Sequence, residues 1–443
     1  MSKETTVQSR DTFKSQFGLV MSMAGLAIGL GNCWRFPYLC GQWGGGTFVF
    51  AYLVGCVLIV VPLAIVEVAI GKGLSKGSID VYSEAYHSPI VGKVLGSVTA
   101  FCQWAQNFYY LAIVGAVVYF VYAGATSMWN TTPPTEIYSG FQGNIGLYIV
   151  LYLLILALLV YTGLRGVNKG IEAVSKVMVP AMIGLFILTF VLTCIFTPNI
   201  VDGLNYYLNP DFSKLGNLQL WAAAIAQALF SIGVGPGALL VYGSHIPRDG
   251  EVPLTIATTC AMDTMAGLLA GLTIIPACVA NGIDPESGSN LIFLVLPQVF
   301  KNIPGGNIIA VFLFLGILCA AYTSACSNQE CAITTFSDGY KLSRGKTVAI
   351  MAAANLIFGM TCIFSDNMMN FWQTVTGDYT FLPSAALGGI TFVYIFGVKN
   401  IREKFINPYT DFKLGRWFDR WVQIIAVPVM VFFMAKTFIG LFA

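Results

Sequence analysis

About eleven apolar runs divide this chain, and each is long enough to cross a lipid bilayer. A membrane-spanning helix needs about 20 residues, and the runs fall at 13–37, 41–71, 90–124, 145–164, 170–197, 217–246, 252–280, 306–335, 347–364, 371–397 and 418–442. Backbone polar groups inside lipid must find partners within the protein, so such segments form helices. The sequence therefore predicts an all-α polytopic membrane protein with about eleven transmembrane helices and a single domain over residues 1–443.

Composition agrees with this class and excludes others. The chain is 56% hydrophobic and 10% charged, whereas a soluble domain is about a quarter charged. Its net charge of +2 does not favour a nucleic-acid partner. The 11 cysteines form no C-x-x-C pair, and the two histidines, His87 and His245, lie far apart in the sequence. No metal site of the zinc type is therefore expected.

The basic residues of the loops predict an orientation. They concentrate on the side that holds the N-terminus, while the other side has mainly Lys214 and Lys301. The positive-inside rule then places the N-terminus in the cytoplasm. The first dozen residues are polar and precede no short apolar run with a cleavage site, so no signal peptide is expected. We expect a multi-pass protein of the plasma or inner membrane.

Glycine interrupts two of the apolar runs. Residues 24–32 read AGLAIGLGN, and residues 230–237 read FSIGVGPG. Each glycine weakens a helix by about 1 kcal/mol relative to alanine, and a break at membrane depth is tolerated only where it is buried or lines a cavity. Gly25 and Gly29 alone would also fit a helix-packing face of small residues. Breaks at corresponding places in two halves favour the other interpretation, a transport site at the midplane.

The residues around the first break resemble a known family. Residues 29–37 read GLGNCWRFP and are followed by GGGTF at 44–48, which closely resembles the first two helices of the neurotransmitter:sodium symporter family. Tyr109-Tyr110 and the AAYTS segment at 320–324 continue the resemblance, which covers almost the whole chain. The family's bacterial members have the LeuT-type fold.

The resemblance implies both an architecture and a function. It implies two inverted repeats of five helices, about 13–197 and 217–397, in which the first and sixth helices are broken. An extra helix at about 418–442 follows. The implied function is sodium-coupled import of an amino acid, or of a closely related zwitterion, by alternating access. No organic cofactor is implied, and the partners are the bilayer and the substrate. The chain is then not an enzyme.

Sodium is a hard cation that takes oxygen ligands, which unwound helices and polar side chains supply. The resemblance implies two sodium ions. Ligands of the first would come from Ala27, Asn32, Ser231 and Asp263. Ligands of the second would come from Gly25, Ile28, Ala320, Thr323 and Ser324. A hydroxyl in a membrane helix can instead bond to its own turn, and that alternative stays open for each serine and threonine.

Asp263 lies within an apolar helix, where most relatives resembling the animal transporters have asparagine and need chloride. An ionised carboxylate beside sodium could replace the charge of that chloride. We therefore expect chloride-independent transport. The alternative is a protonated, hydrogen-bonded buried acid.

The substrate would lie between the two breaks. A helix start at Leu30 and Gly31 directs N–H groups toward an anion, and the hydroxyl of Tyr110 can donate to the same carboxylate. Gln106 and Asn328 stand where leucine-type relatives have apolar residues, so a polar substrate side chain is expected; the alternative for both amides is helix–helix hydrogen bonding. The full predicted set is Leu26, Ala27, Leu30, Gly31, Gln106, Tyr110, Phe230, Ser231, Gly233, Pro236, Ser324 and Asn328.

Gates are expected on both sides of this site. The resemblance places Arg35 at the outer side with Tyr110 and Phe230, and it matches no single acid to Arg35, since Asp366 and Asp378 flank the family's position. At the inner side it implies a pair between Arg10 and Asp338. The sequence leaves open which amino acid is transported, the sodium stoichiometry, proton counter-transport and the oligomeric state.

Two other classes of function are alternatives for a membrane protein of this kind. A membrane-embedded enzyme would need a nucleophile with a base, or a metal cluster, and the sequence offers neither. A channel would need no gates on two sides and would conduct without sodium coupling. Tracer uptake with and without a sodium gradient distinguishes all three.

Overall fold

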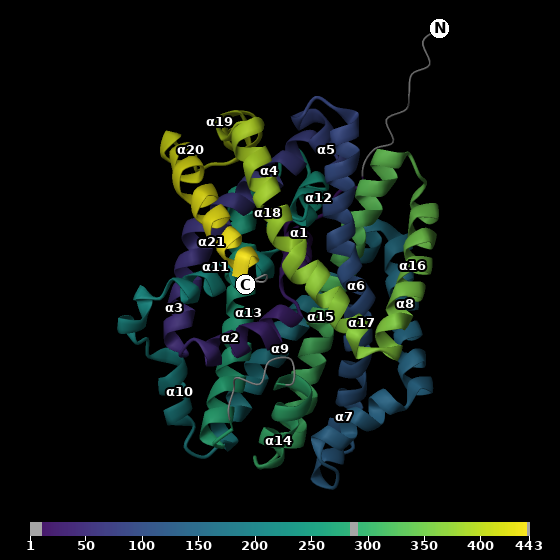
Figure 1. Cartoon of the computed structure of the whole chain (residues 1–443), viewed down its shortest axis with the longest axis vertical. Coiled ribbons are helices and arrows are strands. Elements are labelled where there is room, and N and C mark those ends of the chain that lie inside the picture. The colour runs from purple at the N-terminus through teal and green to yellow at the C-terminus, as the bar shows by residue number, and fades with distance from the viewer. Residues whose placement is uncertain (1–10, 284–290, 441–443) are drawn as a thin grey trace.

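A computed structural model describes residues 11–283 and 291–440. Long helices run between its two ends (Figure 1), and no strand occurs within the described ranges. The eight principal helices of the body are α3 (Gly46–Gly55), α4 (Val61–Leu74), α6 (Pro89–Ala125), α8 (Ile145–Gly166), α9 (Ala173–Phe196), α13 (Val252–Ala280), α15 (Gly306–Tyr340) and α16 (Arg344–Phe364).

These helices have the length and composition of membrane spans. Among the described residues, 7 helices qualify by those two properties, or up to 9 if each bent pair is one span. The stretch Ile145–Phe196 counts once in that number, although Gly166, with φ of 83°, separates α8 from α9. The all-helical, multi-pass class predicted from the sequence is confirmed, and the predicted figure of about eleven counted α8 and α9 separately.

The first helix is broken where the glycines predict. α1 (Gln16–Ala27) ends as the backbone becomes extended at Ile28, with φ −76° and ψ 114°. A π-helical turn from Gly31 then leads into α2 (Phe36–Gln42), and the two halves meet at 55°. Because α1 packs against α9, α13 and α15, this break lies inside protein and not against lipid.

The second break separates α11 (Leu218–Ile232) from α12 (Ala238–Ser244). Gly233, Gly235 and Gly237 in this break have φ values of 78°, 111° and 90°, a region that favours glycine. A Cβ on Gly235 would lie 2.0 Å from the Cα of Ala385. The buried Glu67 of α4 accepts a hydrogen bond from the Gly235 N–H at 2.8 Å. A glutamate side chain thus satisfies a backbone group that has no helical partner at the break.

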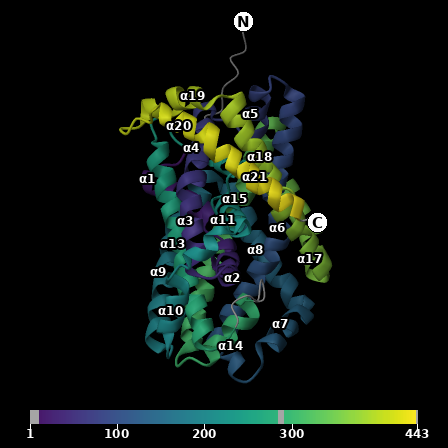
Figure 2. The same cartoon turned by 60° about the vertical axis from the view of Figure 1, so that its left-hand side comes forward.

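The C-terminal region crosses the face seen in Figure 2. It contains another bent pair, Pro383–Ile395 with Val398–Tyr409, which meet at 78°. Its helices are α17 (Asp366–Gln373), α18 (Phe381–Ile390), α19 (Val398–Ile401), α20 (Arg416–Trp421) and α21 (Val427–Gly440).

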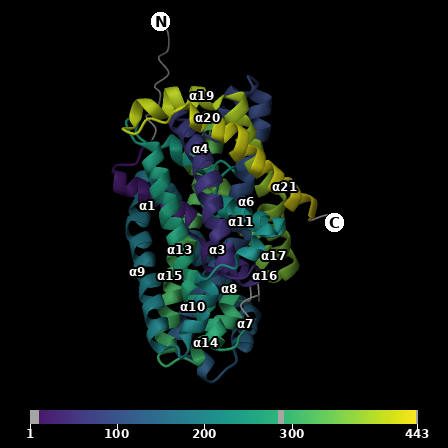
Figure 3. The ribbon, with the colours of Figure 1, turned by 90° about the vertical axis from the view of Figure 1, so that its left-hand side faces the viewer.

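Short helices cover the two ends of the molecule. α5 (Ser78–Ala85) lies with α19 and α20 at the top of Figure 1, which we call the inner end. At the opposite, outer end lie α7 (Pro134–Gly143), α10 (Ile200–Leu208) and α14 (Leu296–Lys301) (Figures 1 and 3). The breaks of α1 and α11 thus lie between two capped ends.

Candidate functional site

A small cavity of about 50 Å³ lies between the two helix breaks. Its walls come from α1, α6, α11, α15 and α18 and from the backbone at the first break. Every predicted substrate residue except Pro236 lines it, and Gly29, Asn32, Gln103 and Phe381 are additions to the predicted substrate set. The lining residues are Leu26, Ala27, Gly29, Leu30, Gly31, Asn32, Gln103, Gln106, Tyr110, Phe230, Ser231, Gly233, Ser324, Asn328 and Phe381.

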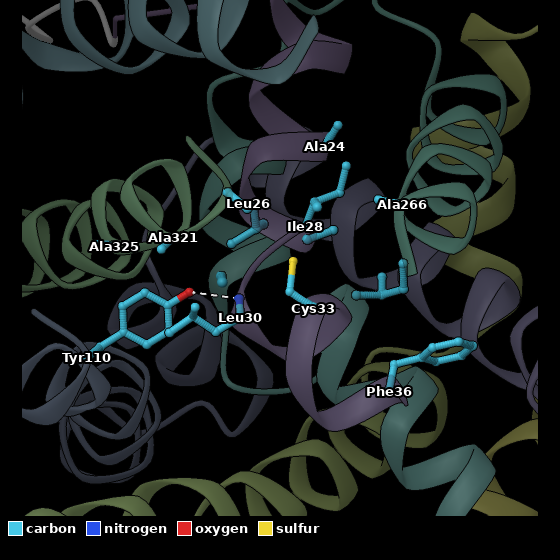
Figure 4. Close-up of a cluster of buried hydrophobic side chains, with 14 of the residues drawn as sticks. Ala24, Leu26, Ile28, Leu30, Cys33, Phe36, Tyr110, Ala266, Ala321 and Ala325 are labelled. Carbon is cyan, nitrogen blue, oxygen red and sulfur yellow. Dashed lines mark hydrogen bonds between the residues drawn. The ribbon is translucent and has the colours of Figure 1, made fainter. Parts of the chain in front are cut away.

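Backbone N–H groups and a phenol meet at one wall of this cavity. The Leu30 N–H donates to the Tyr110 hydroxyl oxygen at 3.1 Å, and Figure 4 shows the Tyr110 ring pointing toward Leu30. Because Tyr110 accepts this bond, its own proton is available to a second acceptor. This wall can therefore hold an anionic group such as a carboxylate.

Side-chain amides from α6 and α15 form another part of the cavity wall. Gln106 and Asn328 both line the cavity and are 6% and 4% exposed. Asn328 also bonds between helices, since its Oδ1 accepts from Gln103. Asn328 therefore lines the cavity and also joins α6 to α15, and its role toward a substrate stays a prediction. Gln103 was missed, although Gln103, Gln106 and Tyr110 stand at helical spacing that places them on one face.

A buried carboxylate lies just behind the cavity. Asp263 of α13 is 0% exposed and accepts from the Asn32 amide at 2.8 Å. The Ser231 hydroxyl approaches both carboxylate oxygens at 2.9 Å, and the Tyr52 hydroxyl donates at 3.2 Å. The structure thus brings three predicted ligands together, and it adds Tyr52, which the sequence analysis missed.

A second group of oxygens joins α15 to the first break. The Ser324 hydroxyl lies 2.8 Å from the Ile28 carbonyl and 3.3 Å from the Gly25 carbonyl. The Thr323 hydroxyl bonds to the Ala320 carbonyl at 3.0 Å, in its own turn. Thr323 is still adjacent, because a Cβ on Gly25 would lie 3.1 Å from its Cβ. All five predicted residues of this site therefore meet here, and all their ligand atoms are neutral.

The same Gly25 position shows a further neighbour. A Cβ on Gly25 would lie 3.2 Å from the Ser175 hydroxyl of α9. Ser175 is buried and was absent from the predicted set, because nothing in the sequence relates residue 175 to residue 25.

A larger cavity of about 320 Å³ lies on the outer side. It shares Leu30, Gly31, Tyr110 and Phe230 with the small cavity. The Arg35 guanidinium lies 4.9 Å from the centre of the Phe230 ring, and that ring lies 5.1 Å from Phe381. Aromatic rings therefore separate the two cavities, with Arg35 on the outer side. Asp366 accepts from Gln142, and the Asp378 side chain lies outside the described part.

The inner end is held together by the start of the chain. The buried Glu172 accepts from the Lys14 N–H at 2.8 Å and from the Ser15 hydroxyl at 3.2 Å. The His245 ring bonds to the Asp11 carbonyl at 2.6 Å. These contacts close the inner end against the N-terminal segment.

The predicted inner pair is only partly visible. Arg10 lies outside the described residues, and Asp338 accepts from the Gly77 N–H at 3.1 Å. Nearby, Arg344 binds Glu330 through two nitrogens, an ion pair that no sequence pattern indicated.

The fold and the paired helix breaks define a LeuT-type membrane protein. The chain superposes on the crystal structure of MhsT in complex with L-phenylalanine with a TM-score of 0.83 and 24% identity, covering 97% of this chain and 100% of that one. The model of the sodium:neurotransmitter symporter family matches residues 10–140 and 135–442, and the chain belongs to this family.

Bacterial relatives agree with that assignment. An uncharacterized sodium-dependent transporter of Bacillus subtilis is 32% identical over 87% of each chain. Another from Haemophilus influenzae is 27% identical over 98% of this chain and 100% of its own length. The predicted family is therefore confirmed, and the protein is a sodium-dependent transporter, not an enzyme.

Proposed function

We propose that this protein imports an amino acid together with two sodium ions and without chloride. The observation that carries the proposal is the position of the Asp263 cluster, directly behind a cavity whose wall offers the Tyr110 hydroxyl to an anion. The similarity to MhsT, whose structure contains L-phenylalanine, supports an amino acid as the class of substrate.

An amino acid fits this cavity through its charged ends. Its carboxylate would accept from the Gly31 N–H and the Tyr110 hydroxyl, where the helix begins. Its ammonium group would face the carbonyls that the two breaks leave without helical partners. The first sodium ion would bind between the substrate carboxylate and Asp263. It would take the Ser231 oxygen and, once the Asn32 amide turns away from its bonds to Asp263 and Gly29, the Asn32 oxygen.

The second sodium ion would bind the neutral group formed by the Gly25 and Ile28 carbonyls and the hydroxyls of Ser324 and Thr323. It would join α1 to α15, so its release would allow α1 to move. In the alternating-access cycle that we propose, the described conformation has its inner end closed and the larger cavity toward the outside. The two repeats, about 13–197 and 217–397, would move relative to each other.

Chloride independence follows from the Asp263 carboxylate. Two sodium ions and a zwitterionic amino acid leave an excess of positive charge beside the first ion. Opposite unit charges about 4 Å apart attract by about 4 kcal/mol at an effective dielectric constant of 20. A fixed carboxylate next to the first ion offsets that charge, so no mobile anion is required.

Uptake by the purified protein in liposomes tests the proposal. Radiolabelled amino acids, supplied singly, should accumulate with an inward sodium gradient and not with the same gradient of potassium. Accumulation should be equal with chloride or gluconate outside. Sodium-independent flux would indicate a channel, and loss of uptake in gluconate would remove the assigned role of Asp263.

A further inference from the structure

The amides beside the cavity form a chain with a fixed direction. The Ala325 carbonyl can only accept, and it receives the Asn107 amide N–H at 3.0 Å. This bond leaves the Asn107 oxygen facing Asn328, whose amide nitrogen lies 3.5 Å away. The Asn328 oxygen then accepts from the Gln103 amide nitrogen at 2.5 Å.

The hydrogen-bond chain ends at Gln103, whose side-chain oxygen is an acceptor. Gln103 is 5% exposed and lines the cavity, and its Oε1 is buried without a hydrogen-bond partner among the described residues. Turning the Gln103 amide would place its oxygen against the Asn328 oxygen. The fixed Ala325 carbonyl therefore determines, through three amides, that the Gln103 oxygen is the amide acceptor left without a partner beside the cavity.

Buried polar groups without a partner are costly, and a bound ligand can remove that cost. A substrate side chain that donates a hydrogen bond would satisfy the Gln103 oxygen, whereas an apolar one would leave it unpaired. The cavity has a volume of about 50 Å³, so each further side-chain atom would require its walls to move. Such a small space favours a short side chain.

We propose that Gln103 is a specificity-determining residue that selects small amino acids with a hydrogen-bond donor on the side chain, as in serine and threonine. This inference rests on the proposed amino-acid transport. It goes further in assigning the direction of the hydrogen bond and the residue that accepts it.

Isosteric substrates test it on the wild-type protein. Binding of L-threonine and L-valine is measured in sodium by thermal shift and by competition, with L-serine and L-alanine as a second pair. Threonine should bind at least ~10-fold more tightly than valine, as expected for a donor meeting an otherwise unpaired acceptor. Equal binding of threonine and valine would overturn the inference while leaving amino-acid transport intact.

Two variants test the residue and the chain. Gln103→Met removes the acceptor at similar volume and should reduce the threonine preference to within ~2-fold. Asn107 does not line the cavity, but its replacement in Asn107→Leu frees the amides of Asn328 and Gln103 to turn. This variant should therefore also weaken the preference for threonine over valine. Thr189→Val is the matched control, because the Thr189 hydroxyl is buried and bonds to its own turn on α9. This variant should prefer threonine over valine as strongly as the wild type does.

The outcomes separate the inference from the function on which it rests. An undiminished threonine preference in Gln103→Met would overturn Gln103 as the acceptor, and one in Asn107→Leu would overturn the directed chain. If no amino acid binds in sodium, the proposed function falls, and this inference falls with it.

Discussion

The two candidate sodium sites differ in charge. The site around Asp263 contains a fully buried carboxylate with three hydrogen-bonding partners, whereas the site around Ser324 consists of neutral carbonyls and hydroxyls. A buried charge is costly without a partner, so the first site depends strongly on a cation. Neutral ligands lose less when the cation leaves. In the proposed function, we therefore expect the first site to hold substrate with sodium and the second to release sodium when α1 moves.

The largest effect is expected at the charged site. Asp263→Asn removes the charge that faces sodium and should reduce sodium-dependent uptake in gluconate ~100-fold or more, as several kcal/mol of attraction are lost. Chloride should restore part of the uptake. Asp211→Asn, a change at an exposed aspartate of the outer end, is the control and should match the wild type. Equal loss in chloride and gluconate would show that the carboxylate has a role other than charge.

A smaller effect is expected at the neutral site. Ser324→Ala removes one hydroxyl from the Ile28 and Gly25 carbonyls and should raise the sodium concentration for half-maximal uptake ~10-fold. No clash is expected, because alanine is smaller than serine. The sodium dependence of uptake at saturating substrate measures the change. An unchanged sodium dependence would remove Ser324 from this site.

Thr323 tests whether a hydroxyl already bonded to its own turn can also bind sodium. Thr323→Val keeps the shape and removes the oxygen, and we expect sodium affinity to fall ~3- to 10-fold, because a hydroxyl oxygen can still accept a cation while it donates to Ala320. Thr323→Ser should restore wild-type affinity. If valine is tolerated without change, the intrahelical bond is the whole role of this hydroxyl.

The smallest effect is expected from Tyr52→Phe. It deletes one of the bonds to Asp263, at 3.2 Å, while Asn32 and Ser231 remain. Sodium affinity should change by only ~2- to 5-fold. Uptake in gluconate should still equal uptake in chloride, as in the wild type. A change as large as that of Asp263→Asn would mean that Tyr52 itself binds the ion, and the two sites would differ less than we infer.

Local sequence was sufficient for much of the fold. Long apolar runs predicted the helices because a bilayer admits no other backbone arrangement for such segments. Gly29, Gly31 and Gly233 predicted both breaks, because glycine disfavours the helix by itself, whatever surrounds it. Asn32 and Asp263 stood out because polar groups are rare in apolar helices and therefore mark function.

Other features were decided only by the tertiary structure. Tyr52, Ser175 and Phe381 reach the site from helices whose order in the sequence says nothing of their distance from residues 25–32. The direction of the Gln103 amide depends on a hydrogen-bond chain that crosses between α6 and α15 and ends on the Ala325 carbonyl. Sequence determined where helices form and break, because those are local energies; packing determined which polar atoms meet and which one is left to the substrate, because hydrogen bonds form through space.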